Sequence, residues 1–176
     1  RWRFVVQCVG AGAFDRNKFW DEICVKLFDY NNYNIVHIFG DIHGCFAPLK
    51  EYFEKYPYNE NDAYIFTGDY IDRGIQNKET LEFLLTLYDK KNVLMLEGNH
   101  ERWAYYYAID EIENIKSHDF KQYTIPQIYD MNMSDLRNFY RRLGQLAYFT
   151  FDGQKYIVSH GGIPYIPLED GGLVSI

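Results

Sequence analysis

Short apolar runs alternate with amphipathic stretches along most of the chain. The runs "NIVHIFG" (34–40), "AYIFTG" (63–68) and "NVLMLEG" (92–98) have the length and apolar content of buried strands. Residues 47–56 and 77–90 lie between them and show helical periodicity. We expect their inward faces to carry Leu49, Phe53, Leu81, Leu84, Leu85 and Tyr88. Such alternation of strands and helices is typical of an α/β fold.

The second half of the chain contains a long polar stretch and then a hairpin. Residues 101–140 are rich in tyrosine and charge, and we expect them to be helical in parts. The segment "LAYFTFDGQKYIVSHGG" (146–162) reads as two strands joined by Asp152 and Gly153, which is a strong hairpin signal. The chain shows neither internal repeats nor low-complexity tracts, so a solenoid is not predicted.

The pattern changes at Asn34. Residues 1–33 are predicted to be an N-terminal extension, or a linker from a preceding region, and 34–176 to form the main domain. Within the extension we expect a weak strand or linker and then a short helix in residues 16–33. That helix is predicted from the helical spacing of Phe19, Trp20, Ile23, Leu27 and Phe28. Because the sequence starts at Arg1 without a methionine, we expect it to be part of a longer protein.

Composition narrows the class of protein. The net charge of −7 makes a broad contact with nucleic-acid backbone unexpected, because such footprints are usually basic. The three cysteines show no CxxC spacing, which argues against a disulfide framework or a zinc knuckle and favours a reducing, cytoplasmic setting. No apolar run approaches the roughly 20 residues that span a bilayer, so we expect no membrane segment.

Polar clusters follow the predicted strands. In open α/β sheets, ligands sit at the carboxyl ends of strands, so these clusters are expected to meet in one crevice. Taken singly, a Gly-Asp pair is more often a turn, and a lone histidine is more often a surface or core residue. Three of the five histidines nevertheless fall in these clusters, which favours a shared site. The clusters are "GDIHG" (40–44), "GDYIDRG" (68–74), "GNHE" (98–101) and "SHGG" (159–162).

The residue types in these clusters point to a metal. Carboxylate oxygens, an amide oxygen and imidazole nitrogens together suit borderline-to-hard divalent ions such as Mn, Fe or Zn. The adjacent glycines let the backbone turn sharply and let ligands approach closely. Two histidines lie outside the clusters: we expect His37 to pack within its strand and His118, in a charged stretch, to be a solvated surface residue.

In this order and spacing, the four clusters resemble the signature of the calcineurin-like metallophosphoesterases, and specifically of the phosphoprotein phosphatase branch. The chain is similar to bacterial serine/threonine phosphatases, diadenosine-tetraphosphate hydrolases and the phosphatase module of polynucleotide kinase-phosphatases. This resemblance implies an α/β fold with a β-sandwich core flanked by helices. It also implies two divalent metal ions, with Mn favoured over Fe or Zn, and a metal-activated hydroxide that attacks a phosphoester.

The resemblance implies a role for each matching residue. Asp41 and His43 would bind the first metal, Asp69 would bridge both, and Asn99 and His160 would bind the second. His100 would be the general acid that protonates the leaving oxygen, with Asp72 as its orienting partner. Arg73 would clamp the phosphate. A carboxylate shared by two ions is the usual way to hold a dinuclear centre together.

Several activities fit this inventory. We expect a metal-dependent phosphatase acting on phosphoproteins or other phosphomonoesters. A nucleotide pyrophosphohydrolase and an RNA-end phosphatase remain alternatives, because the four clusters indicate a reaction at phosphorus and do not identify the group attached to it. Trp103 or Tyr106 would offer a stacking surface for bases, although rings at helical spacing more often belong to a core. An inactive scaffold with this fold is the third alternative, and an upstream partner domain such as a P-loop kinase is compatible with the resemblance.

Counting ligands leads to one more expectation. The family uses a further histidine beyond the "HGG" cluster, whereas "IPYIPLEDGGLVSI" (163–176) contains none. It also lacks the later strands that would finish the sheet and a second phosphate-binding arginine. We therefore expect the 176 residues to form a phosphatase domain that is incomplete at its C-terminal side and that holds the second metal weakly.

Overall fold

The computed structural model describes residues 25–162, 165–167 and 173–175. Its centre is a parallel sheet in which β2 (Val36–Phe39), β3 (Ala63–Phe66) and β4 (Val93–Met95) lie side by side in chain order. These strands fall within the three predicted apolar runs. The predicted α/β class is confirmed.

A second sheet faces this one. It contains β1 (Val25–Asp29), β5 (Leu146–Phe151) and β6 (Gln154–Ser159), in the order β1-β5-β6. Strands β5 and β6 form the predicted hairpin, with Asp152 at φ 49° and Gly153 at φ 70°. Positive φ at both central residues is the geometry of a two-residue hairpin turn. A short antiparallel pair, β7 (Tyr165–Pro167) and β8 (Leu173–Ser175), follows.

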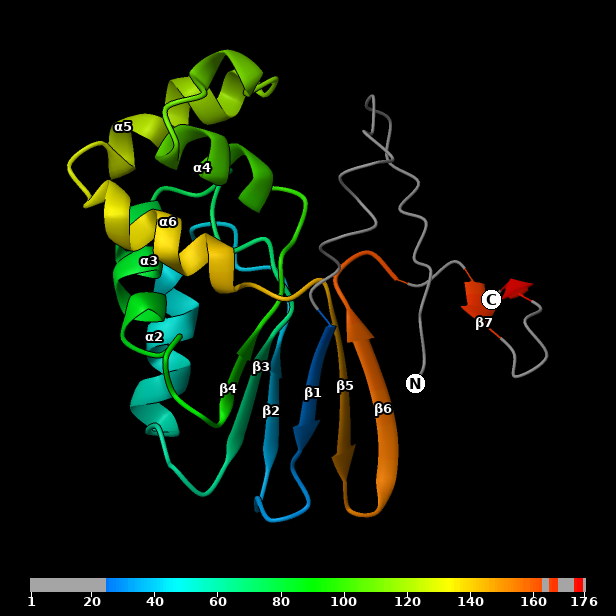
Figure 1. The fold of residues 1–176 in the computed structure, drawn as a ribbon. Helices are drawn as coiled ribbons and strands as arrows, with labels where there is room; N and C mark the ends of the chain where they lie inside the picture. Colours follow the sequence, from blue (N-terminus) through cyan, green and yellow to red (C-terminus); the bar gives the residue numbers. More distant parts are fainter. Residues whose placement is uncertain (1–24, 163–164, 168–172, 176) are drawn as a thin grey trace.

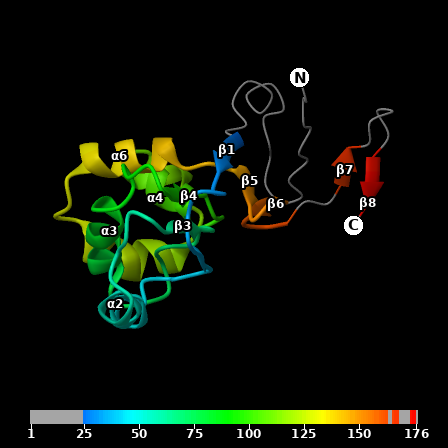
Figure 2. The same cartoon turned by 90° about the horizontal axis from the view of Figure 1, so that it is seen from below.

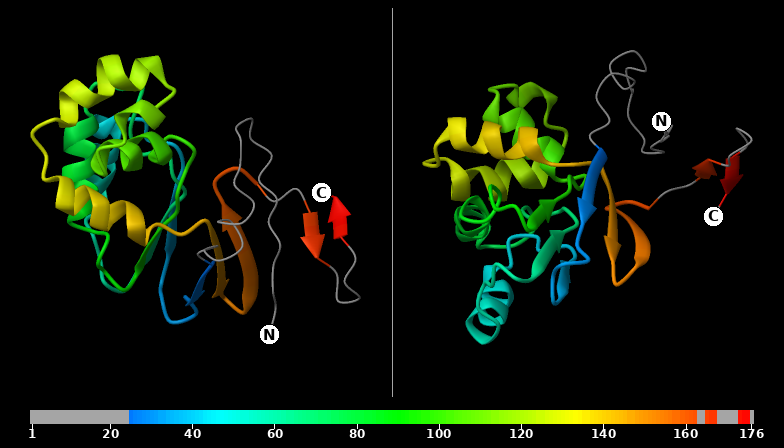
Figure 3. Two further views of the ribbon diagram at one scale, coloured as in Figure 1. Left: turned by 45° about the horizontal axis from the view of Figure 1, so that its top comes forward. Right: turned by 60° about the horizontal axis from the view of Figure 1, so that its bottom comes forward.

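The helices cover the other face of the parallel sheet (Figures 1 and 2). The tyrosine-rich, charged stretch after β4 is helical in parts, as predicted, and includes a π-helical turn, η2. The two tilted views in Figure 3 show the helices on one side of the parallel sheet and the β1-β5-β6 sheet on the other. The helical elements are α2 (Phe46–Lys55), α3 (Asn77–Leu85), α4 (Glu101–Ala108), η1 (Ile112–Asn114), η2 (Phe120–Thr124), α5 (Ile125–Ile128) and α6 (Met133–Arg142).

Alternation along β3 divides the core into two parts. Tyr64 and Phe66 point into the larger cluster beneath the helices, whereas Ala63 and Ile65 point into the cluster between the two sheets. All four side chains are buried, because β3 is the central strand and is covered on both faces. The two faces of the parallel sheet therefore pack against helices on one side and against a second sheet on the other, which is the expected sandwich.

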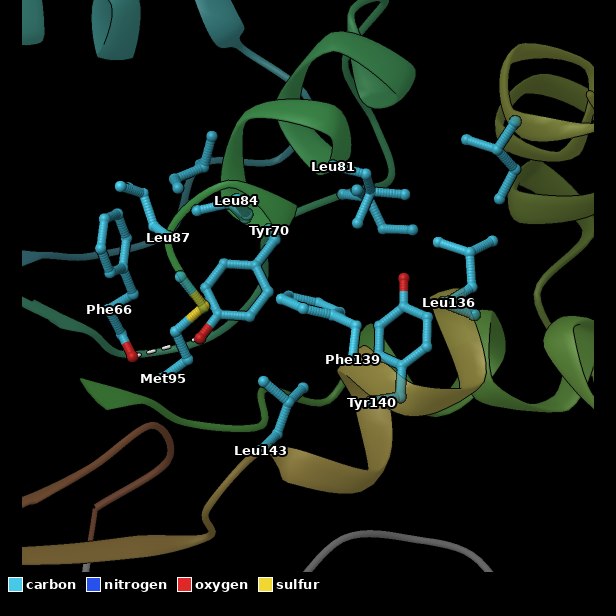
Figure 4. Close-up of a cluster of buried hydrophobic side chains, with 14 of the residues drawn as sticks. Phe66, Tyr70, Leu81, Leu84, Leu87, Met95, Leu136, Phe139, Tyr140 and Leu143 are labelled. Carbon is cyan, nitrogen blue, oxygen red and sulfur yellow. Dashed lines mark hydrogen bonds between the residues drawn. The ribbon is translucent and has the colours of Figure 1, made fainter. Parts of the chain in front are cut away.

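Figure 4 shows the larger cluster around Tyr70. The Tyr70 ring packs against Phe139 of α6, with ring centroids 5.9 Å apart. Its hydroxyl donates to the carbonyl oxygens of Phe66 (3.2 Å) and Leu96 (2.5 Å). These bonds satisfy a buried polar group and join the ends of β3 and β4, three residues before Asp69 and Asn99 respectively.

The prediction of a helix within residues 16–33 is wrong for residues 25–29, which form strand β1. Residues 16–24 lie outside the described part of the chain. Strand β1 pairs in parallel with β5, from Val25 opposite Leu146 to Asp29 opposite Thr150. Leu27 is 74% exposed, whereas Phe28 packs against the cluster between the sheets, so these two residues do not share a buried face. Pairing with the distant strand β5 has thus decided the structure of these residues, against the helical spacing of their apolar side chains.

The inward faces expected of the two helices are confirmed. Leu49, Leu81 and Leu84 are buried, and Phe53, Leu85 and Tyr88 are partly buried against the same cluster. Helix α3 ends at Leu85, earlier than the expected residue 90. Among the described residues, no helix combines the length and apolar character needed to cross a bilayer.

Candidate metal centre

The structure brings all eight predicted site residues to one edge of the sheets. Asp41 and His43 follow β2, Asp69 to Arg73 follow β3, and Asn99 and His100 follow β4. His160 follows β6 in the second sheet, and its Nδ1 lies 3.1 Å from the carbonyl oxygen of Thr67 at the end of β3. The site therefore forms where the two sheets meet.

Asp69 is the hub of the site. Its side chain is 5% exposed, and its Oδ2 lies near the Nε2 atoms of three histidines: 3.6 Å from His43, 3.9 Å from His100 and 3.4 Å from His160. Its Oδ1 accepts the backbone N–H of His100 at 3.0 Å. One carboxylate oxygen thus faces three imidazoles that come from three different loops.

Asp41 and Asn99 complete the outer side of the site. Asp41 Oδ2 lies 3.7 Å from His43 Nε2, and its Oδ1 lies 3.9 Å from His160 Nδ1. Asn99 Oδ1 lies 3.1 Å from His160 Nε2. Both residues are exposed, so this side of the site opens to solvent.

These residues fit a divalent cation. The potential ligand atoms of His43, Asp69 and His100 lie within 4.8 Å of one another, and so do those of Asp41, Asp69 and His160. Asp69 belongs to both groups, as a shared ligand would. His43 Nε2 is buried and has no hydrogen-bond partner, which is costly unless a ligand occupies it. Spacings of 3.4–3.9 Å around Asp69 Oδ2 suit atoms gathered around an ion with bonds of about 2.1 Å.

A second arrangement lies beside the ligands. His100 Nδ1 lies 2.8 Å from Asp72 Oδ2, and the Asp72 side chain is 4% exposed. The guanidinium of Arg73 lies 3.2 Å from His100 Nε2. Because an arginine only donates, Nε2 accepts, and the Nδ1 proton of His100 is donated to Asp72. This tautomer follows from the donors and acceptors around the ring.

Four site residues adopt the left-handed backbone conformation that non-glycine residues rarely visit. The φ angles are 48° for His43, 53° for Asp69, 76° for Asp72 and 70° for Arg73. Such conformations cost about 1–3 kcal/mol each and persist where surrounding contacts hold them. Here the Asp69 carbonyl accepts the N–H groups of Ile42 (3.0 Å) and His43 (2.9 Å), which ties the first two loops together.

Glu101 is a residue whose role the sequence analysis missed. It is 1% exposed and accepts three backbone N–H groups: those of Asp69 (2.7 Å) and Gly98 (2.7 Å) on Oε2 and that of Tyr70 (2.9 Å) on Oε1. Burial raises its pKa to about 8, against the three N–H groups, which favour the ionised form. Gly98 leaves room for this contact, because a Cβ there would collide with Asp69. The signal available in the sequence was the acidic last residue of the "GNHE" (98–101) cluster.

Glu101→Gln is expected to destabilise the fold by about 1–3 kcal/mol. Above pH 8, where Glu101 is ionised and where unfolding should be measured, its carboxylate offers acceptors to all three N–H groups, whereas an amide must turn its NH₂ toward at least one of them. Urea unfolding followed by circular dichroism would measure the loss. Glu113→Gln, at an exposed position in η1, is the matched control and should change stability by less than about 0.5 kcal/mol. An unchanged unfolding midpoint in Glu101→Gln would mean that the three bonds contribute nothing.

The two histidines outside the clusters lie as expected. His37 Nδ1 lies 2.7 Å from the Tyr52 hydroxyl, and its ring stacks on Tyr64 with a centroid distance of 4.8 Å. The side chain of His118 is 83% exposed. Trp103 and Tyr106 are partly buried against the core of the helical layer.

Comparison with known proteins gives a consistent picture. A family model described as calcineurin-like phosphoesterase matches residues 35–174. A curated relative, the serine/threonine-protein phosphatase BSL2 of Arabidopsis thaliana, is 42% identical over 74 residues. That alignment covers 38% of this chain and 7% of the plant protein.

Two solved structures share the fold. The crystal structure of a proposed diadenosine tetraphosphatase matches with a TM-score of 0.60 and 19% identity, covering 85% of this chain and 59% of that one. A protein serine/threonine phosphatase of Saccharomyces cerevisiae matches with a TM-score of 0.53 and 22% identity, covering 80% and 42%. The chain therefore spans less than two thirds of the length of each of these proteins.

Proposed function

Because the chain belongs to the calcineurin-like phosphoesterase family, we propose that it is a metal-dependent phosphatase that hydrolyses phosphomonoesters. The observation that carries this proposal is the arrangement of the His43 and His160 nitrogens around one oxygen of buried Asp69, with the His100–Asp72 pair beside it. A site with metal ligands and a separate proton donor has the parts that phosphoester hydrolysis requires.

We assign the metal ligands as the sequence suggested. Asp41, His43 and Asp69 would hold one divalent ion, and Asp69, Asn99 and His160 a second. Mn²⁺ is the preferred candidate, with Fe and Zn as alternatives, since the donor set mixes oxygen and nitrogen. Two such ions would lower the pKa of a water molecule and neutralise charge on the phosphate oxygens.

His100 would donate the proton that the leaving oxygen needs. When its Nε2 takes up a proton, the ring becomes an imidazolium, and the carboxylate of Asp72 at Nδ1 stabilises that charge. Arg73 faces the same Nε2 and would turn its guanidinium to the phosphate of a bound substrate, since this side chain is exposed. Its departure from His100 would free Nε2 for protonation.

Phosphoproteins are the substrate class that we propose first. The support is the plant relative, whose name describes a serine/threonine-protein phosphatase and whose aligned segment is 42% identical. A cytoplasmic location would suit this activity, and the exposed free thiol of Cys45 fits a reducing compartment.

An activity panel tests the proposal. We expect the purified chain to hydrolyse a serine phosphopeptide when Mn²⁺ is added and to lose this activity in EDTA. Diadenosine tetraphosphate and 3′-phosphorylated RNA in the same panel would identify a nucleotide or RNA-end phosphatase. Two-metal binding by calorimetry without turnover of any substrate, including nitrophenyl phosphate, would contradict the proposal and favour a binding scaffold.

A further inference from the structure

A buried threonine from the helical layer contacts Asp72. Thr124 is the last residue of the π-helical turn η2 and is 0% exposed. Its hydroxyl donates to Asp72 Oδ1 at 2.7 Å. The hydroxyl thus bonds to the carboxylate oxygen that His100 does not use.

This bond fixes the orientation of a buried carboxylate. Asp72 Oδ1 accepts two hydrogen bonds, one from the Thr124 hydroxyl and one from the backbone N–H of Arg73 at 3.0 Å. With Oδ1 held from two directions, Oδ2 is directed at His100 Nδ1. A buried anion also needs donors to offset the cost of leaving water, and Thr124 supplies a side-chain hydroxyl as one of them.

The segment that carries Thr124 is anchored in the core of the helical layer and at the end of the loop that carries Asp72. Phe120, at the start of η2, is fully buried in the core of the helical layer. Gln127 Nε2 donates to the carbonyl oxygen of Gly74 at 3.1 Å, and its Oε1 accepts the backbone N–H of Asn77 at 3.0 Å. A π turn is a rare form that is concentrated at functional sites. Here it delivers a hydroxyl to the catalytic loop.

We propose that Thr124 is a positioning residue for proton transfer: it holds Asp72 so that Asp72 orients His100. This proposal rests on the proposed phosphatase function. The hydrogen bond that the structure gives the Thr124 hydroxyl goes to Asp72 and not to a predicted metal ligand, so its effect should appear in the proton-transfer step.

Thr124→Val removes the hydroxyl and keeps the shape of the side chain. We expect kcat for an alkyl phosphate, whose leaving oxygen needs a proton, to fall about 10- to 100-fold. The kcat for nitrophenyl phosphate should change little, because this good leaving group departs without protonation. KM and the amount of bound metal should also change little, because the Thr124 hydroxyl bonds to Asp72 and not to a predicted metal ligand. Thr124→Ser should restore the alkyl phosphate rate, since its hydroxyl can make the same bond. Thr124→Ala tests the loss without placing a methyl group against the carboxylate.

Thr80→Val is the matched control. Thr80 is equally buried, and its hydroxyl donates at 2.8 Å to the carbonyl oxygen of Gln76, the residue before helix α3, and not to Asp72. It should cost stability without separating the two substrates. Equal losses on both substrates in Thr124→Val, a loss of metal, or a failure of Thr124→Ser to recover the rate would overturn the proposal.

An NMR measurement separates this proposal from the proposed function. In ¹⁵N-histidine-labelled, Zn²⁺-loaded protein, the His100 Nδ1 proton bound to Asp72 should give a downfield signal. Thr124→Val should shift this signal or broaden it by exchange, and Thr124→Ser should keep it. An unchanged signal in Thr124→Val would overturn the positioning role, whether or not the wild-type protein hydrolyses any substrate.

Discussion

Asp69→Asn is expected to abolish phosphatase activity and to lower the occupancy of both metal positions. The substituted amide keeps one oxygen, but it loses the negative charge that faces His43, His100 and His160 at 3.4–3.9 Å. An ion loses most of its attraction to a site when the shared anionic ligand becomes neutral. Metal content by mass spectrometry after gel filtration, together with turnover of a phosphopeptide in Mn²⁺, would measure both effects.

Two other variants distinguish the loss of the Asp69 charge from a general loss of folding or activity. Arg73→Ala should keep both metals and raise KM, because Arg73 would contact phosphate and not the ions. Asp130→Asn removes an exposed carboxylate that pairs with Lys78 at 2.5 Å, and it should alter neither metal content nor turnover. Full occupancy of both positions in Asp69→Asn would show that another residue bridges the ions.

His100→Asn is expected to slow hydrolysis of an alkyl phosphate by about 10²- to 10⁴-fold. Asparagine can donate a hydrogen bond but cannot transfer a proton to the leaving oxygen at neutral pH. Nitrophenyl phosphate should be affected much less, because its leaving group is stable as an anion. Steady-state kinetics on the two substrates at saturating Mn²⁺ would provide the ratio.

The controls for this variant address folding and metal binding. His118→Asn makes the same change at an exposed histidine outside the site and should leave both rates unchanged. Metal content of His100→Asn should stay near that of the unmodified protein. A similar fall in rate for both substrates would remove His100 from the proton-transfer role that we propose.

The convergence of the site could be predicted from the sequence because its residues follow strand ends. Parallel strands that lie in chain order carry their carboxyl ends to the same edge, so Asp41, Asp69 and Asn99 had to lie close together. Local spacing was sufficient for this inference, since each loop begins where a recognisable apolar run stops.

The supporting contacts could not be predicted in the same way. Thr124 reaches Asp72 across 52 positions of the chain, and Glu101 reaches Asp69 across 32. Both contacts depend on how the helical layer packs on the sheet, which no local pattern encodes. Strand β1 was mistaken for a helix for a related reason, because its partner β5 lies in the last third of the described chain.

The pairing of β1 with β5 has a consequence for how the chain folds. Strands β2, β3 and β4 pair with sequence neighbours through short crossovers, whereas Asp29 meets Thr150 across 121 positions. Loop-closure entropy opposes such distant pairing until local structure has shortened the loop. We expect the parallel sheet and its helices to assemble first and β1 to dock late. During synthesis, β1 would leave the ribosome early and wait as an unpaired edge until β5 emerges. Only then would His160, which follows the β5–β6 hairpin, join the other ligands, so metal binding would report the completion of folding.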